Sequence, residues 1–566
     1  MRSLSRPGGR FGPTPSAGRS CRLLPIVFGL ALGLAACGDE VIEAEVLPNT
    51  ADAVATGDAS DEEAEAPRPS GLLVHEPGTF DGYTLITPLN SMEAHLVDMA
   101  GEIVHTWTTE YAPAGGIYLL DDGYLLRCGR VEDIPGFHGG GIGGVIQKLD
   151  WDSNVVWEYH VASDRLRQHH DIEPMPNGNV LLIAWELISA EEAIAHGRDP
   201  AQVGDEGFWP DIVQEVRPVG PTGGEVVWEW RAWDHIVQDR DPDLPGYGLI
   251  PRYPGHIDIN FDHRYREPEL SEEEKLRRKE LEEQMAALGY VGGTPADAPP
   301  RGPPPGPDGR RGPPPGAPGG DAPRERPRQR PDWMHTNSIA YSPEHDLIAL
   351  SSPRMNEVFI IDHSTTMAEA AEGSGYRQWK TDVPRIWRGG GGRYKKSGDI
   401  LWRWGNPRNV GEGGAEDQAM FFQHDATFLI GENRLSLLVF NNGRGRPDGD
   451  WSSVDELVLP FDSRDGFRPA RQLDPPRPVW TYADKDGFLS EFISGAQRLP
   501  NGNTLICSGK NGRVFEVTSE GEILWDWWSP LGGEIEPSEQ GGNAPPNALF
   551  RATRIAPDHP GLVGRL

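Results

Sequence analysis

Short apolar stretches that end in tryptophan recur along the chain. They read GEIVHTW, SNVVWEY, GEVVWEW, GDILWRW, RPVWTY and GEILWDW, and their tryptophans are Trp107, Trp157, Trp228, Trp402, Trp480 and Trp525. Upstream lie stretches such as DGYLLRCG and NGNVLLIA, whose Asp-Gly and Asn-Gly pairs are typical of hairpin turns. Each unit thus predicts four antiparallel strands, the last of which ends in tryptophan. Radial repetition of such units predicts an all-β, six-bladed β-propeller.

The six units set the expected domain organisation. Their starts fall near residues 71, 115, 169, 335, 423 and 494. The propeller is therefore expected to occupy residues 71–566. We expect the repeated tryptophans to fill the space between blades, a structural role rather than a chemical one.

One long insertion, residues 265–331, interrupts the repeats. Residues 271–290 predict a helix, because Ser271 and Glu274 are spaced as a capping box. Residues 291–331 are rich in Pro, Gly and Arg, which is typical of disorder. We expect this partly helical, partly disordered insertion to be a solvated excursion rather than a lid over the propeller.

The N-terminal segment has the pattern of an export signal. Five arginines precede an apolar run, residues 23–34, which is short for a membrane span and fits a secretory signal. The Leu-Ala-Ala-Cys sequence that ends at Cys37 is similar to a bacterial lipobox. We expect residues 1–36 to be a lipoprotein signal peptide, Cys37 to be acylated, and residues 37–70 to be a disordered acidic tether. The alternative is a secreted protein in which Cys37 is incidental.

These features predict an exported protein, periplasmic or at the cell surface, that a lipid anchors to a membrane. The composition also limits the kinds of partner that we expect for it. The 566 residues include 53 Lys and Arg against 86 Asp and Glu, a net charge of −33. Such a surface repels nucleic acid, so nucleic-acid binding is not expected.

Three histidines occupy one position in three consecutive units. His170, His335 and His424 each lie seven residues before the expected turn of the innermost strand. In the second and sixth units the equivalent positions are about Gly115 and at Ser494. Because equivalent positions in a propeller point at the same end of its axis, the three imidazoles are predicted to converge.

The second strand of each unit returns to the face where the first began. In the fourth unit it ends at Arg354, which should lie on the His335 side, and in the fifth it ends over residues 440–444. Asn337 points the same way as His335, because side chains alternate along a strand. The predicted cluster of His170, His335, Asn337, Arg354 and His424 suits a small anion such as a sulfate or phosphate ester.

The residues alone leave two other interpretations of this cluster open. Histidines can hold a metal ion, with His170 and Asp171 as part of the site, or they can be structural. Thiolate metal sites are not expected, because Cys21, Cys37, Cys128 and Cys507 form no CxxC or Cys/His pair with zinc-site spacing.

The chain resembles the bacterial arylsulfotransferase family, the PAPS-independent aryl-sulfate sulfotransferases, from about residue 75 to 550. The resemblance rests on HHDIEPMPNGNVLL, DWMHTNSIAY, SSPRMNEVFIID, ILWRWGNP and QHDATF. It implies a six-bladed propeller with its site at the channel mouth. It also implies that His424 is the nucleophile that becomes a transient sulfohistidine, with His170, His335, Asn337 and Arg354 as the other active-site residues.

The implied reaction is ping-pong transfer from an aryl sulfate to a phenol. His424 takes the sulfuryl group, Arg354, His335 and Asn337 stabilise its oxygens, and His170 is the candidate acid–base. Asp171 and Asp425 could orient the histidines that precede them. The resemblance implies no nucleotide cofactor, and the sequence has no P-loop.

Two features depart from the family pattern. The insertion is not typical, and no cysteine lies near these motifs, whereas some members have a disulfide near the site. We expect no bridge between Cys128 and Cys507. Two other functions stay open: a cell-surface propeller that binds a sulfated or phenolic ligand or a protein partner without turnover, and a quinone-cofactor dehydrogenase.

Overall fold

The computed structural model describes residues 69–132, 134–261, 331–373, 390–431, 434–462, 466–467, 475–532 and 547–566. They belong to one compact unit, Arg68–Leu566. The expected signal peptide, residues 37–68 of the tether, the helix predicted at 271–290 and residues 265–330 of the insertion lie outside the described residues. Among the helices that the structure describes, none has the length and apolarity to cross a membrane.

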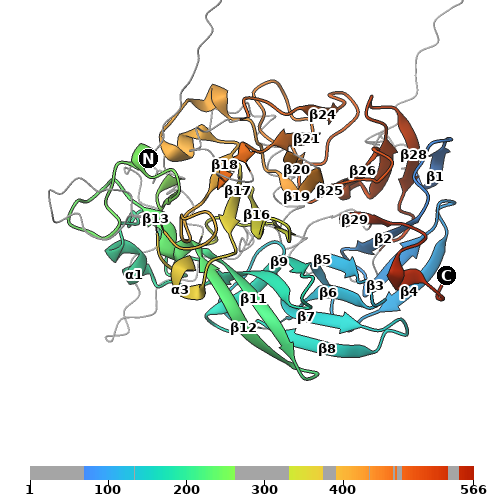
Figure 1. Ribbon diagram of the computed structural model, residues 1–566, viewed down its shortest axis with the longest axis horizontal. Helices are drawn as coiled ribbons and strands as arrows, with labels where there is room; N and C mark the ends of the chain where they lie inside the picture. The colour runs from blue at the N-terminus through green and yellow to red at the C-terminus, as the bar shows by residue number, and fades with distance from the viewer. Residues whose placement is uncertain are drawn as a thin grey trace, which may run out of the picture. The chain divides into compact units, whose positions relative to one another are not determined.

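The described chain is all-β, and its antiparallel sheets are arranged like the blades of a propeller (Figure 1). The first sheet runs, from its innermost strand outward, through β29 (Leu549–Ile555), β2 (Tyr83–Pro88), β3 (Glu93–Val97) and β4 (Ile103–Thr108). Another comprises β15 (Ser338–Ser342), β16 (Leu347–Ser352), β17 (Glu357–Asp362) and β18 (Trp402–Trp404). The next comprises β19 (His424–Gly431), β20 (Arg434–Asn441), β21 (Ser453–Val458) and β24 (Trp480–Ala483).

Between the first of these sheets and β15 lies an eight-stranded sheet made of two four-stranded halves. The halves are β5 (Pro113–Leu119), β6 (Leu125–Arg130), β7 (Gly144–Leu149) and β8 (Val155–His160), then β9 (Leu166–Pro174), β10 (Val180–Glu186), β11 (Asp211–Val219) and β12 (Gly223–Arg231). A parallel pairing of Gly115 with His170 joins β5 to β9. The halves therefore meet at their innermost strands.

The last sheet has five strands. They are β25 (Gly495–Arg498), β26 (Thr504–Ser508), β27 (Arg513–Val517), β28 (Ile523–Trp528) and, at the outer edge, β1 (Gly71–His75). Short pairs are formed by β13 (Ile236–Val237) with β14 (Ile257–Asp258) and by β22 (Phe461–Asp462) with β23 (Gly466–Phe467). The helical elements are α1 (Ala190–Ala195), α3 (Met367–Ala370), η1 (Ala232–His235), η2 (Ile250–Arg252), η4 (Pro407–Val410), η5 (Ala415–Asp417), η6 (Gly509–Asn511) and η7 (Pro560–Leu562).

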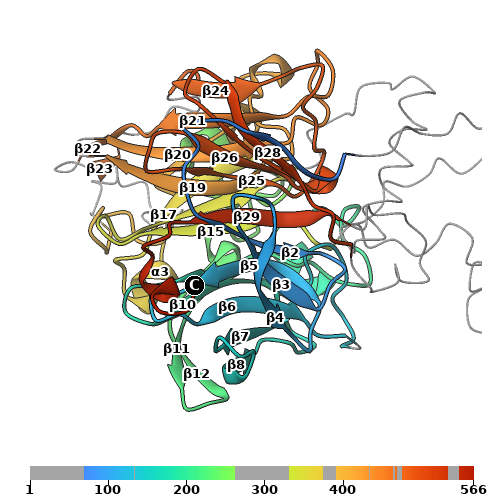
Figure 2. The ribbon, with the colours of Figure 1, turned by 90° about the vertical axis from the view of Figure 1, so that its right-hand side faces the viewer.

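The expectation that the first unit starts near residue 71 is wrong. Residues 71–75 form β1, which pairs with β28 of the last sheet. The innermost strand of the first sheet is β29, from the other end of the chain, and it pairs with β2 (Figures 1 and 2). The N-terminal strand β1 is thus part of the last sheet, and the C-terminal strand β29 is part of the first.

The predicted hairpin turns are confirmed. Gly123, Gly178 and Gly502 close the first hairpins of three units with φ of 82°, 84° and 93°, a region that favours glycine. The structural role of the tryptophans is also confirmed, since five indole N–H groups donate to the neighbouring sheet or, in the eight-stranded sheet, to its other half. These bonds run from Trp107 to Asp150, Trp157 to Gly223, Trp228 to Thr365, Trp480 to Ser519 and Trp525 to Met99.

Apolar side chains pack between facing sheets. One cluster joins Leu181 and Val213 of one sheet to Ile348 and Phe359 of the next, all fully or nearly fully buried. Because close-packed side chains of this kind cannot shift freely, each sheet holds its neighbour in place.

A histidine that pairs with two carboxylates lies at the same contact between the sheets. The His363 imidazole, just after β17, is 2.6 Å from Asp346 and 3.0 Å from Glu215 of β11. Burial opposes its charge, but the hydrogen bonds to Asp346 and Glu215 raise the pKa of His363 to about 9. The imidazolium therefore stabilises the fold fully below its unfolded pKa of about 6.5, and this contribution is lost as pH rises through about 9.

We expect His363→Gln to lower the melting temperature at pH 6 and to have a smaller effect at pH 10. Melting of both proteins across this range measures the difference, in which titrations common to both cancel. A difference that stays constant with pH would show that His363 is not charged in the fold.

Candidate active site

Irregular turns in the innermost strands carry the three predicted histidines. His170 in β9 has φ 53°, and His335, three residues before β15, has φ 55°. His424 opens β19 and is followed by Asp425 with φ 53°. The pairing register shifts beside His170 and after His424. Such bulges re-aim side chains, and left-handed backbone at non-glycine residues persists only where the surroundings hold it.

The structure brings the predicted histidines together. The His170 and His335 rings lie with centroids 4.4 Å apart. Burial, and then the nearby charges of His335, His169, His424 and Arg354, hold the pKa of His170 well below its ordinary value. His170 is therefore neutral at pH 7 and can accept a proton.

The hydrogen bonds of His424 define its tautomer. Its Nδ1 lies 2.7 Å from Oδ1 of Asn442 and 3.1 Å from the carbonyl oxygen of Phe422. The amide orientation is fixed, because Nδ2 of Asn442 donates to the carbonyls of Ser490 and Ile493. Both neighbours of Nδ1 are acceptors, so Nδ1 carries the proton and Nε2 carries the lone pair.

That lone pair is available for chemistry. Nε2 of His424 is buried and has no hydrogen-bond partner among the residues that the structure describes. Burial lowers the pKa of His424 to about 3, against the opposing effect of Asn442. A neutral imidazole with a free Nε2, beside other imidazoles and a guanidinium, is equipped to be a nucleophile.

Asp332 joins two of the predicted residues. Its carboxylate lies 2.5 Å from Nδ1 of His335 and 3.2 Å from the guanidinium of Arg354. Burial alone would raise the pKa of Asp332, but Arg354 and His335 hold it below its ordinary value. Asp332 therefore orients both groups as an anion. Asp332 was not among the predicted site residues, although it lies in the same DWMHTN motif as His335.

Asn337 is buried, and its amide donates to the backbone beside His424. Nδ2 donates to the carbonyl of Gln423, the residue before His424, at 2.8 Å. The Oδ1 atom has no hydrogen-bond partner within the described part of the chain. Asn337 thus ties the turn before β15 to the turn that carries His424.

The suggestion that Asp171 and Asp425 orient the histidines that precede them is wrong. Both carboxylates bind Arg551 of β29, at 2.8 and 2.9 Å. The Nδ1 atom of His170 instead lies 2.8 Å from Nδ1 of His169. Left-handed turns separate each aspartate from the preceding imidazole, so the two side chains diverge.

A glycine-rich loop before β7 covers His170. The His170 N–H donates to the carbonyl of Gly141 at 2.6 Å. A Cβ at Gly141 would lie 2.3 Å from the imidazole. Only glycine therefore fits at position 141. The preceding histidine, His169, stacks on Trp185, with ring centroids 4.2 Å apart.

Cysteine does lie near the site, contrary to expectation. Cys128 and Cys507 are buried free thiols. The Cys128 sulfur is 3.6 Å from the carbonyl oxygen of His170, because β6 runs beside the bulged strand β9. Burial raises the pKa of Cys128 to about 12, so it stays a thiol.

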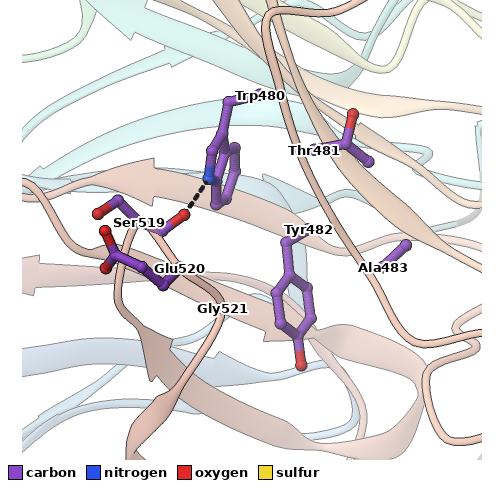
Figure 3. A pocket seen from close by; sticks show the side chains of 7 residues that line it. All are labelled: Trp480, Thr481, Tyr482, Ala483, Ser519, Glu520 and Gly521. Carbon is purple, nitrogen blue, oxygen red and sulfur yellow. Dashed lines mark hydrogen bonds between the residues drawn. The ribbon is translucent and has the colours of Figure 1, made fainter. Parts of the chain in front are cut away.

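In the ranges that the structure covers, no three His, Cys, Asp or Glu side chains are arranged to hold a metal ion. Figure 3 shows a hollow elsewhere, between the outer strand β24 and the β27–β28 turn, with Trp480, Tyr482 and Glu520 in its lining. None of the predicted site residues lines it.

Solved structures resemble the chain only distantly. A protein of unknown function from Bacteroides caccae is 11% identical, with a TM-score of 0.36 over 83% of this chain and 98% of that one. Hydrazine synthase of Kuenenia stuttgartiensis (8%, TM-score 0.29, 82% and 81%) and apo AztD of Citrobacter koseri (8%, TM-score 0.28, 84% and 98%) are similar to a lesser degree. Likenesses this weak carry no argument about function.

No curated protein matches the sequence. The family comparison is informative, because the model of the arylsulfotransferase (ASST) family matches residues 84–526. That span contains all three histidines and Arg354, and it covers most of the chain. The chain belongs to the arylsulfotransferase family.

Proposed function

We propose that this protein is an aryl-sulfate sulfotransferase that moves a sulfuryl group from an aryl sulfate to a phenol through a sulfohistidine at His424. Family membership supports arylsulfotransferase activity in general. The observation that carries the finer proposal is the unpartnered, buried Nε2 of His424 beside His170 and His335.

In the first half-reaction Nε2 of His424 attacks the sulfur of the donor. The N–S bond forms, the S–O bond to the aryl group breaks, and a phenolate leaves. The imidazole becomes positively charged, and Asn442 stabilises that charge by accepting the Nδ1 proton's hydrogen bond at 2.7 Å. Arg354 offers donors to the sulfuryl oxygens, with Asp332 holding its guanidinium in place.

In the second half-reaction a phenol attacks the same sulfur. Neutral His170 takes the phenol's proton, the new S–O bond forms, and the N–S bond to His424 breaks. Because its lowered pKa leaves His170 without a proton at rest, His170 has none to donate in the first half-reaction and is assigned as the base in the second. The released phenolate and protonated His170 then exchange the proton, which balances the reaction.

Trapping the intermediate tests this proposal. We expect the protein, mixed with p-nitrophenyl sulfate without acceptor, to gain the mass of one SO₃ group on the peptide that contains His424. Added phenol should remove the adduct and form phenyl sulfate. A burst of p-nitrophenolate without a His424 adduct would contradict the covalent step. Absence of both release and adduct would favour a binding protein.

We also propose an architecture and a cellular location for this protein. We propose six blades, in which the eight-stranded sheet is two blades joined at Gly115 and His170. The lipobox-like sequence supports acylation of Cys37 and export to a membrane surface. Mass spectrometry of the membrane fraction tests this, since an unmodified Cys37 in the mature protein would refute it.

A further inference from the structure

One arginine on the C-terminal strand reaches three strands in two other sheets. From β29, the guanidinium of Arg551 lies 2.8 Å from Asp171, 2.9 Å from Asp425 and 3.2 Å from the hydroxyl of Tyr118. These partners lie on β9, β19 and β5. These three contacts lie at the innermost strands. Charges there are shielded from water, which strengthens the attraction between them.

The two carboxylates are the residues that directly follow His170 and His424. Each also bridges to the next sheet. Asp171 accepts the N–H of Ile339 at 3.2 Å, and Asp425 accepts the N–H of Ala496 at 2.8 Å. Asp425 is therefore held at both oxygens, Oδ1 toward Arg551 and Oδ2 toward Ala496. In Asp171 a single oxygen, Oδ2, accepts from both Arg551 and Ile339.

Glycines make room for these anchors. A Cβ at Gly116 would lie 2.3 Å from Oδ1 of Asp171. A Cβ at Gly495 would lie 2.3 Å from Oδ2 of Asp425 and 3.1 Å from the side chain of Arg551. The neighbouring innermost strands thus leave the space that the Asp171–Arg551–Asp425 bridge occupies.

We propose that Arg551 is a positioning residue, which holds the left-handed turns that aim His170 and His424 at each other. This inference rests on the proposed function. The turns are strained, with φ of 53° at both His170 and Asp425, and strained backbone relaxes once its anchors are lost. Without the guanidinium, two buried carboxylates face each other unpaired, and both turns are free to move.

Arg554 supplies a matched control. It lies on the same strand, is more deeply buried than Arg551, and binds Glu516 and Thr84 rather than the aspartates. We expect Arg551→Lys and Arg551→Gln to lower kcat for transfer by about 10- to 100-fold while KM stays within about threefold, because misplacement of a reacting group by about 1 Å costs up to about 100-fold. Arg554→Lys should keep kcat, whatever it does to the melting temperature.

The overturning result is an Arg551 variant whose kcat follows its melting temperature as that of the Arg554 variants does. A second readout does not depend on turnover. Histidine-selective ¹⁵N NMR, assigned with His170 and His424 variants, should show changed tautomer ratios or pKa values for both imidazoles in Arg551→Gln and unchanged ones in Arg554→Gln. If the wild type fails to transfer sulfuryl groups, the NMR still decides the positioning role. Unchanged imidazole signals in Arg551→Gln would refute it.

Discussion

His424→Asn is expected to abolish sulfuryl transfer from p-nitrophenyl sulfate to phenol, with a loss in kcat of at least about 10⁴-fold, as for loss of a covalent nucleophile. The variant removes the Nε2 lone pair, which has no hydrogen-bond partner in the described chain. Since His424 contributes one hydrogen bond to Asn442 through Nδ1, the fold should survive. Steady-state assays and circular dichroism measure the two effects.

His345→Asn is the matched control for this experiment. His345 makes one comparable hydrogen bond, to Ser342 at 3.1 Å, in the turn between β15 and β16. It should transfer sulfuryl groups as the wild type does and form the SO₃ adduct. A His424→Asn protein that still transfers would remove His424 from the mechanism and point to another imidazole of the cluster.

Asp332→Asn is expected to lower kcat by about 10²- to 10³-fold, the usual cost of losing one oriented donor to a developing charge. The substitution removes the anion shared by His335 and Arg354. Both bonds are made to the same oxygen, Oδ2, and an amide oxygen in its place carries no charge, so it holds the guanidinium more weakly. Since Asp332 opposes the effect of burial on His335, the pKa of His335 should also fall further, which NMR can follow.

Asp455→Asn separates this effect from general destabilisation. Asp455 on β21 is as buried as Asp332, and it binds Asn441, Ser453 and Thr481 instead of site residues. We expect Asp455→Asn to lower the melting temperature with little change in kcat. Equal losses of kcat in the two variants would mean that Asp332 acts through the fold alone.

The convergence of the histidines was predictable because it depends on a repeat. His170, His335 and His424 share a seven-residue spacing to the turn, and antiparallel pairing then carried Arg354 to the same face. The same reasoning placed residues 440–444 on that face, but it assigned no role to Asn442. A spacing predicts which face a residue occupies, but it does not reveal which hydrogen bond its side chain makes.

The contacts that complete the site could not be predicted in this way. Arg551 meets Asp171 across 380 residues, and no repeat links the two positions. The exchange of end strands was equally hidden, because β1 could pair with an exposed sheet edge at either end of the chain. In the structure β29 fills the innermost place in the first sheet, and β1 pairs with the outer edge of the last sheet.

The position of β29 also affects when the protein becomes reactive during its biosynthesis. A ribosome makes this strand after all the other strands that the structure describes, and chains generally begin to fold from their N-terminal parts. A nascent chain can pair the other sheets while Asp171 and Asp425 still lack Arg551. With the proposed role of Arg551, the two imidazoles take up their final positions only after this last strand has been made and has paired.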